Sequence, residues 1–152
     1  MSVDFYVALP AADWPSSAQV QQCIAEQGYP IELQRFPLVS PREGSTEGAQ
    51  VLLDGTLAYL EGEVLTMAVA PDDVAAINER LAASGSPQIT ASDAVISFRT
   101  RSPVETRAAS YLIASLVICF DGFGFEPQGN FSGRSEFANA LLAGAEALEG
   151  LE

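Results

Sequence analysis

The chain has 152 residues, of which 48% are hydrophobic and 18% charged, and this length and composition are typical of one folded globular domain. Its 20 acidic and 7 basic residues give a net charge of −13, and every basic residue is an arginine. A field of this sign repels nucleic-acid phosphates and anionic lipid head groups and attracts basic proteins. We therefore expect neither nucleic acid nor a membrane as a direct partner.

The first third of the chain predicts a strand, a helix and a second strand. Val3–Leu9 has the composition of a strand. In Ser16–Gln27 the apolar side chains recur at helical spacing, and Gly28 is a suitable helix C-cap. Ile31–Leu38 follows as the second strand, and a run of Gly, Ser, Thr and Glu at 43–48 marks a loop.

The next segment, Gln50–Ala70, predicts a three-stranded antiparallel meander. The dipeptide 54–55, Asp-Gly, suits a two-residue hairpin turn, and the run 61–63, Glu-Gly-Glu, suits a second turn. Pro71 then begins a helix, because its fixed φ is favourable in the first turn, and Gly85 ends that helix.

The second half again alternates strands and helices. Ala94–Thr100 predicts a strand, and the run from Ser102 to Glu105 matches a capping box at the start of a long apolar helix that reaches Phe120. Phe123–Glu126 predicts a short strand, and Arg134–Leu148 predicts a final helix rich in Ala and Leu. Since no apolar stretch reaches the ~20 residues of a bilayer span, we expect the long apolar helix to be buried in the core.

These elements predict a single α+β domain over residues 1–152. The expected architecture is a sandwich of a mostly antiparallel sheet with helices packed largely on one side. A strand, a helix and a glycine-containing junction occur in each half, near Gly28 and near Gly122, which leaves two β-α-β-type halves open as an interpretation.

The cysteines and the N-terminus predict the compartment. Cys23 and Cys119 lie within apolar helical patterns, and we expect both to be free, buried thiols, because a free cysteine usually behaves as a small hydrophobic side chain. The chain opens Met-Ser-Val-Asp-Phe, without the basic residues that begin a secretion signal. A cytoplasmic location is therefore expected.

The residue types on which most enzyme mechanisms depend are missing. The sequence has no histidine, which removes the commonest general base, the Ser-His and Cys-His pairs and most zinc sites. It has no lysine, which excludes a P-loop, and no Cys-x-x-Cys motif. The acidic pair Asp72 and Asp73 is explained by the positive end of the helix that Pro71 begins. We expect no catalytic residue, no metal and no cofactor.

Arginines gather where a strand passes into the helix that follows Ser102. Arg99 and Arg101 lie at this junction, where backbone N–H groups and the helix dipole favour an anion. They are candidates for binding a small anionic ligand. The other interpretation is that they form surface ion pairs with the surplus carboxylates.

Acidic residues are concentrated between Arg42 and Arg80, where eight of them occur with no basic residue between them. Successive turns of a meander emerge at opposite ends of the sheet, so the 43–48 loop and the 61–63 turn should share one end. We take the carboxylates expected at that end as the candidate partner-binding site: Glu43, Glu47, Glu61 and Glu63. The alternative is a solvated polar rim that only keeps the protein soluble.

Several short features lie in order along the first half of the chain. They are Leu-Pro at 9–10, Gly-Tyr at 28–29, and strands around Leu-Asp-Gly at 53–55 and Tyr-Leu-Glu at 59–61. In this layout the chain resembles small acidic bacterial immunity-type proteins of polymorphic toxin systems. The resemblance implies a non-enzymatic inhibitor that neutralises a basic toxin or effector domain through an acidic surface, and it assigns no residue roles.

Two other functions stay open. A nucleic-acid-mimicking inhibitor from a mobile element would use the same acidic residues against a nucleic-acid-binding enzyme. A small ligand-binding or enzymatic α+β domain would instead use Arg99 and Arg101 for an anionic ligand.

Overall fold

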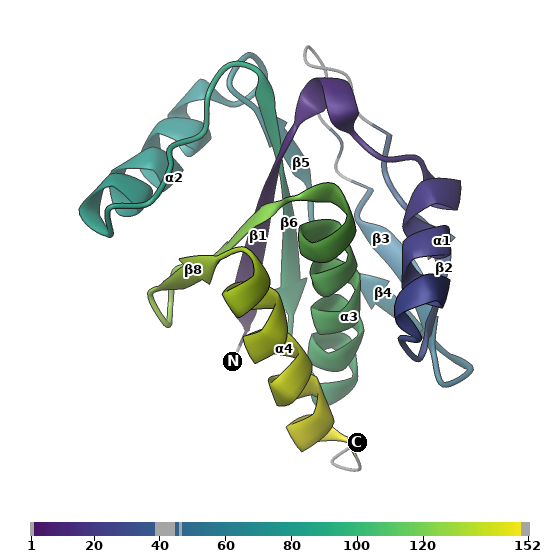
Figure 1. The fold of residues 1–152 in the computed structure, drawn as a ribbon. Coiled ribbons are helices and arrows are strands. Elements are labelled where there is room, and N and C mark those ends of the chain that lie inside the picture. Colours follow the sequence, from purple (N-terminus) through teal and green to yellow (C-terminus); the bar gives the residue numbers. More distant parts are fainter. Residues whose placement is uncertain (1, 39–44, 46, 150–152) are drawn as a thin grey trace.

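The computed structural model describes residues 2–38, 45 and 47–149 (Figure 1). The strands are β1 (Val3–Pro10), β2 (Ile31–Arg35), β3 (Ala49–Leu53), β4 (Thr56–Leu60), β5 (Val64–Thr66), β6 (Asp93–Thr100), β7 (Phe123–Glu126) and β8 (Phe131–Gly133). The helices are α1 (Ser17–Gln27), α2 (Pro71–Ala83), α3 (Pro103–Phe120) and α4 (Ser135–Leu148), with a short 3-10 turn, η1 (Ala11–Asp13), after β1.

The strands form two antiparallel sheets. Five strands pair in the order β5-β6-β1-β7-β8, and three pair in the order β2-β3-β4. The expected α+β fold, with antiparallel sheets and helices packed against them, is confirmed. Of the two β-α-β-type halves left open by the sequence, the second is present: β6 and β7 lie on either side of β1 and are connected by α3. The first half is not such a unit, because β1 and β2 lie in different sheets.

The segment after β4 corrects the predicted meander. The hairpin of β3 and β4 is confirmed, and its turn residues Asp54 and Gly55 both have positive φ, 50° and 85°. Residues 61–63, however, make no turn. The Arg99 N–H donates to the Glu61 carbonyl at 2.7 Å and the Ser97 N–H to the Glu63 carbonyl at 2.8 Å, so the chain runs straight on beside β6. The third strand therefore belongs to the larger sheet.

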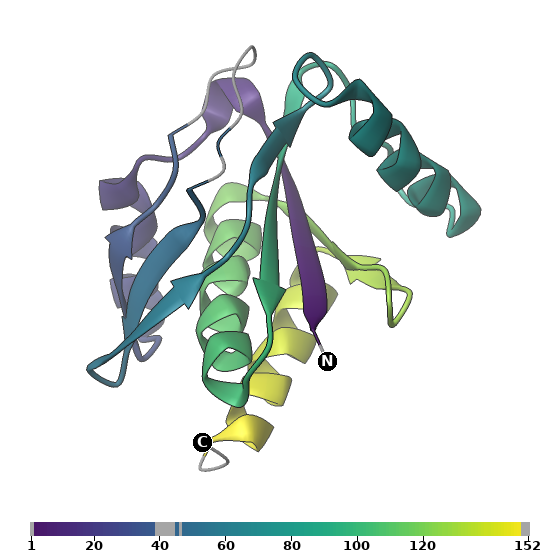
Figure 2. The same cartoon turned by 180° about the vertical axis from the view of Figure 1, so that it is seen from behind.

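Gly62 is the residue that allows this close pairing. A Cβ at this position would lie 1.8 Å from the Ser97 carbonyl oxygen, so no other residue fits without moving the strands apart. The sequence pattern Glu-Gly-Glu suggested a turn, and the same glycine instead serves a close approach of two strands. As a result β4 and β5 form one continuous ribbon that joins the two sheets (Figure 2).

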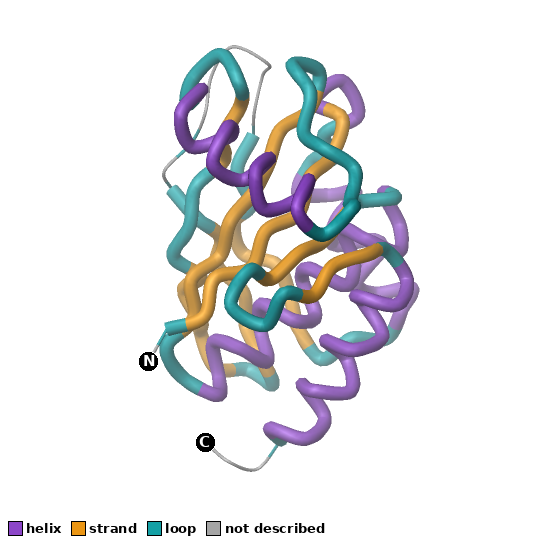
Figure 3. Tube along the Cα trace, turned by 90° about the vertical axis from the view of Figure 1, so that its left-hand side faces the viewer, coloured by secondary structure: helices purple, strands orange, loops and turns teal. Residues whose placement is uncertain are grey.

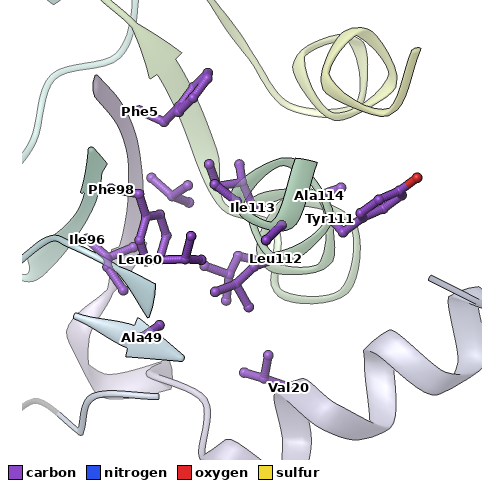
Figure 4. Packing of buried hydrophobic residues seen from close by; sticks show 14 of the residues in the cluster. Phe5, Val20, Ala49, Leu60, Ile96, Phe98, Tyr111, Leu112, Ile113 and Ala114 are labelled. Carbon is purple, nitrogen blue, oxygen red and sulfur yellow. The ribbon is translucent and has the colours of Figure 1, made fainter. Parts of the chain in front are cut away.

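Three helices cover the inner side of both sheets. The helix α3 lies at the centre, with α1 and α4 beside it, and its residues from Arg107 to Val117 are all buried. In Figure 4, Leu112 and Ile113 of α3 lie among Phe98 and Leu60 from the two sheets. This helix is apolar on most faces because each face meets a sheet or another helix.

By length and composition α3 also matches a membrane span, but 61% of it is buried inside the fold, as in the core helix of a globular domain. Of the helices in the described part of the chain, α2 alone lies on the opposite, outer side of the larger sheet (Figure 3). This helix packs Val74, Ile77 and Leu81 onto Leu65, Val95 and Phe125.

Side chains cap the helices partly as expected. The Ser102 Oγ accepts the Glu105 N–H at 3.2 Å, which confirms the N-cap, but the Glu105 carboxylate accepts from the Arg101 N–H instead of closing the box on Ser102. A complete capping box occurs at α1, between Ser16 and Gln19.

The two cysteines form a disulfide, and the prediction of free thiols is wrong. Cys23 of α1 and Cys119 at the end of α3 are bonded, with their Cα atoms 6.3 Å apart. Their spacing of 96 residues carries no signal, because only the packing of α1 on α3 brings them together. Disulfides persist mainly in oxidising compartments, so this bond argues against the expected cytoplasmic location, which stays a prediction.

We predict that replacing both cysteines with alanine lowers the free energy of unfolding by about 2–4 kcal/mol, because the bond closes a long loop in the unfolded chain. Urea denaturation of the wild-type protein and of the double variant measures this difference. A reducing agent should lower the stability of the wild-type protein alone, and equal stability of the two proteins under oxidising conditions would contradict the bond.

Candidate partner-binding surface

The outer face of the two sheets is the side opposite α1, α3 and α4. Along the continuous ribbon of β4 and β5, alternate side chains point to this face because successive residues of a strand face opposite ways. The outward residues are Leu57, Tyr59, Glu61, Glu63 and Leu65, and the inward residues include Ala58, Leu60 and Val64, which are buried. Leu57 and Tyr59 are 60% and 43% exposed.

Strand register places the outer side chains of the larger sheet in three rows. The rows are Glu61, Arg99 and Asp4; then Glu63, Ser97, Tyr6 and Phe125; then Leu65, Val95, Ala8 and Phe123. The third row is apolar and α2 packs against it. α2 also reaches Phe125 and Tyr6 in the second row, whereas the first row carries ionised side chains, so the face changes from apolar to charged along the strands.

The acidic side chains of the first row, Asp4 and Glu61, each form an ion pair with an arginine. The Arg99 Nε donates to the Asp4 Oδ1 at 2.8 Å, and the Arg101 guanidinium bonds to the Glu61 carboxylate. The hydrogen bond from Arg101 lowers the pKa of Glu61, and the bonds to Asp4 and Glu61 raise the pKa of Arg99 and of Arg101. An incoming anion would have to compete with Asp4 and Glu61 for these two guanidinium groups.

Two adjoining cavities open on the charged and middle rows, and together we call them the outer groove. One, of about 300 Å³, is lined by Asp4, Tyr6, Glu61, Gly62, Glu63, Ser97 and Arg99. The other, of about 340 Å³, lies between the sheet and α2 and shares Asp4, Tyr6 and Glu63 with the first. The groove thus runs from the charged end of the sheet to the underside of α2.

The helix α2 supplies one wall of the groove. Asp73, Ala76, Ile77 and Arg80 line the larger cavity, and their spacing of three, four and seven residues puts them on one helical face. The floor carries Tyr6 and Phe125, whose rings stack with centroids 5.0 Å apart. The pKa of Tyr6 is raised, chiefly by burial and next by the charge of Asp4, with a further contribution from Glu63.

Of the four carboxylates predicted to share a site, the structure places two, Glu61 and Glu63, in the same groove. Glu61 and Glu63 both line the outer groove, whereas Glu43 lies outside the described residues. The backbone of Ser45 pairs with Val64, the residue after Glu63. Glu47 is exposed, and its carbonyl accepts hydrogen bonds from the Tyr59 hydroxyl and the Arg35 guanidinium on the outer face of the smaller sheet.

Sequence reasoning missed Asp4, Tyr6 and Asp73 as groove residues. The alternation in β1, where Phe5, Val7 and Leu9 are buried, is the signal that could have placed Asp4 and Tyr6 on the opposite face. Asp73 had been explained by its place in the first turn of α2. Its contact with the groove depends on how α2 lies on the sheet.

A third cavity, of about 240 Å³, lies beyond the C-terminal half of α2. At its edge the Arg134 guanidinium lies 5.4 Å from the Phe123 ring centroid and pairs with Asp121 at 3.3 Å. Across residues 2–38, 45 and 47–149, no group of three Asp, Glu, Cys or His side chains is arranged to hold a metal ion.

Comparison of the chain with protein-family models, with curated proteins and with solved structures finds no match.

We predict that Gly62→Ala disturbs the groove, because the new methyl group collides with the carbonyl oxygen of Ser97, the residue whose N–H donates to the Glu63 carbonyl and so pairs β6 with this segment. The variant should lose about 1–3 kcal/mol of stability, as overpacked sites commonly do. Gly144→Ala in α4 is the matched control, since its Cβ meets nothing within 4 Å and alanine favours a helix. Thermal unfolding of both variants tests this, and an equal response would show that the close approach at Gly62 is unimportant.

We predict that the Tyr6 phenol ionises above its ordinary pKa of 10.0. The difference in phenolate absorbance between the wild-type protein and Tyr6→Phe gives the midpoint. The variants Asp4→Asn and Glu63→Gln should lower that midpoint, and Asp72→Asn, outside the groove, should leave it unchanged. Because the folded chain keeps this proton where the unfolded chain loses it, Tyr6 should reduce stability as the pH rises above 10.0.

Proposed function

We propose that the chain is a non-enzymatic, immunity-type inhibitor that neutralises a basic toxin or effector domain by binding it on the outer face. The observation that carries the proposal is an acidic groove with carboxylates available to a partner. Glu63 and Asp73 line this groove, and neither forms an ion pair with any residue in the described part of the chain.

Long-range charge supports the same partner. With a net charge of −13, the protein attracts basic surfaces before contact and repels acidic ones. Arg99 and Arg101 are bonded to Asp4 and Glu61, so they do little to repel an approaching cation, and Arg80 on the α2 wall adds one positive charge to the carboxylates of the groove. Complementary charge of this kind increases the rate of encounter and selects the partner.

Exposed apolar side chains next to the charges supply the remaining part of a protein interface. Leu57 and Tyr59 lie on the same ribbon as Glu61 and are 60% and 43% exposed. Tyrosine is common among residues that dominate binding energy, whereas acidic rims chiefly affect specificity and association rate. The outer face thus combines an apolar anchor with an acidic groove.

The test is binding to a basic toxin or effector domain, sought among the proteins encoded next to this one, measured by calorimetry at several salt concentrations. We predict that Glu63→Arg with Asp73→Arg weakens binding by about tenfold or more, because groove carboxylates become like charges to the partner. Raising the salt concentration should weaken binding of the wild-type protein.

The matched control is Asp72→Arg with Glu79→Arg, which makes the same charge change at two exposed positions of α2 outside the groove. This control should bind nearly as tightly as the wild-type protein. If both double variants weaken binding equally, net charge alone is responsible and the siting is wrong. If neither weakens it, the acidic groove is not the binding surface.

A further inference from the structure

One part of the outer groove is shaped as a slot between Tyr6 and Glu63. These residues belong to the same row, with only Ser97 between them. Adjacent strands lie about 4.8 Å apart, so the two backbones are separated by about 10 Å. The Ser97 side chain is small and stays close to the sheet, since its Oγ accepts the Glu63 N–H at 3.2 Å. The 300 Å³ cavity is the space above it.

One wall of the slot is an aromatic ring held in place from behind. Phe125 is the register partner of Tyr6 on β7, the side away from Ser97, and the two rings are stacked with an angle of 10° between their planes. The other face of the Tyr6 ring therefore borders the slot over Ser97. Cationic and planar groups bind such faces through the ring quadrupole and by stacking.

The opposite wall of the slot is the carboxylate of Glu63. Glu63 is exposed and forms no ion pair with the residues that the structure describes. The end of the slot is closed by Arg99, which is bonded to Asp4. A ligand that enters the slot therefore meets a carboxylate on one side, an aromatic face on the other and a neutralised ion pair at the end.

We propose that this slot receives an arginine side chain of the basic partner, with its guanidinium stacked on Tyr6 and hydrogen-bonded to the Glu63 carboxylate. The inference rests on the proposed function, because it names the partner group that the groove recognises. A guanidinium is flat enough to stack on the ring, and it presents two parallel N–H donors to a carboxylate. A lysine ammonium is a compact point charge, which can pair with the carboxylate but neither stacks flat on the ring nor presents two parallel donors. An anion is disfavoured, because the cavity is lined by the carboxylates of Asp4, Glu61 and Glu63, and Arg99, which also lines it, is bonded to Asp4.

The test uses a blocked arginine, N-acetyl-arginine methylamide, titrated into the protein while backbone amide signals are followed by NMR. We expect saturable shifts at Ser97 and Glu63 with a dissociation constant on the order of millimolar. Blocked lysine should bind about threefold or more weakly, and blocked citrulline, which has the same shape without charge, should bind more weakly still.

Variants separate the two walls. Glu63→Gln should weaken binding of blocked arginine by about tenfold, and Tyr6→Leu by about threefold, whereas Tyr6→Phe keeps the aromatic face and should bind like the wild-type protein. Ser97→Val raises the floor of the slot and should also weaken binding, which gives a second test if Tyr6→Leu does not fold. Asp72→Asn is the charge-matched control outside the groove and should bind normally.

The inference is overturned if citrulline or lysine shifts Glu63 as strongly as arginine does, if Tyr6→Leu binds as well as the wild-type protein, or if no saturable shift occurs. Failure here and failure of the proposed function are distinguishable. If blocked arginine does not bind but a partner complex is sensitive to Glu63→Arg with Asp73→Arg, the arginine slot is rejected and the inhibitor function is retained. If blocked arginine binds but no basic partner does, arginine recognition is retained and the inhibitor function is rejected.

Discussion

The pairing of residues 61–63 with β6 is the constraint on which the rest of the structure depends. Two backbone hydrogen bonds, from Arg99 to Glu61 and from Ser97 to Glu63, join the smaller sheet to the larger one. They form only because Gly62 has no side chain to hold the strands apart. The two sheets thereby share one inner side, which α3 fills, and one outer side, on which Glu61 and Glu63 stay in phase with Tyr59 and Leu65.

The distribution of helices follows from the same arrangement and leaves the outer groove open. α1, α3 and α4 bury the apolar side of both sheets, so α2 alone is available for the outer side. It covers the row that contains Leu65 and Val95, where burial of apolar surface is favourable. The next rows contain carboxylates and guanidinium groups, and burying these would cost free energy unless each found a partner. Arg99 and Arg101 meet that need for Asp4 and Glu61, whereas Glu63 and Asp73 stay solvent-exposed and form no ion pair with the residues that the structure describes.

Covalent and ionic links hold the outlying elements to α3. The disulfide from Cys23 to Cys119 fixes α1 at the C-terminal end of that helix. Near its N-terminal end the buried Arg107 lies 3.6 Å from the carboxylate of Asp54, in the turn between β3 and β4. The smaller sheet is therefore linked to α3 near its N-terminal end, and α1 is linked to it at its C-terminal end. Both links help to hold the ribbon of β4 and β5 in place relative to the larger sheet.

The sequence by itself determined the local elements and the overall charge. Helical spacing, the Ser102 cap, the Asp54-Gly55 turn and the proline that begins α2 act within a few residues, so the α+β class and most element boundaries could be predicted. The acidic character of the surface is a matter of composition.

Only the tertiary structure decided which distant residues meet. Ile31–Leu38 was expected as one strand but ends at Arg35, where the pairing with β3 becomes irregular. The disulfide, the crossing of β5 into the larger sheet and the meeting of Tyr6, Glu63 and Asp73 in one groove all join segments far apart in the chain. Such contacts depend on strand order and on helix packing, which have no counterpart in the spacing of residues along the sequence. Gly62 shows the reason, since a glycine can serve a turn or a close approach, and the choice is made by the strand that lies beside it.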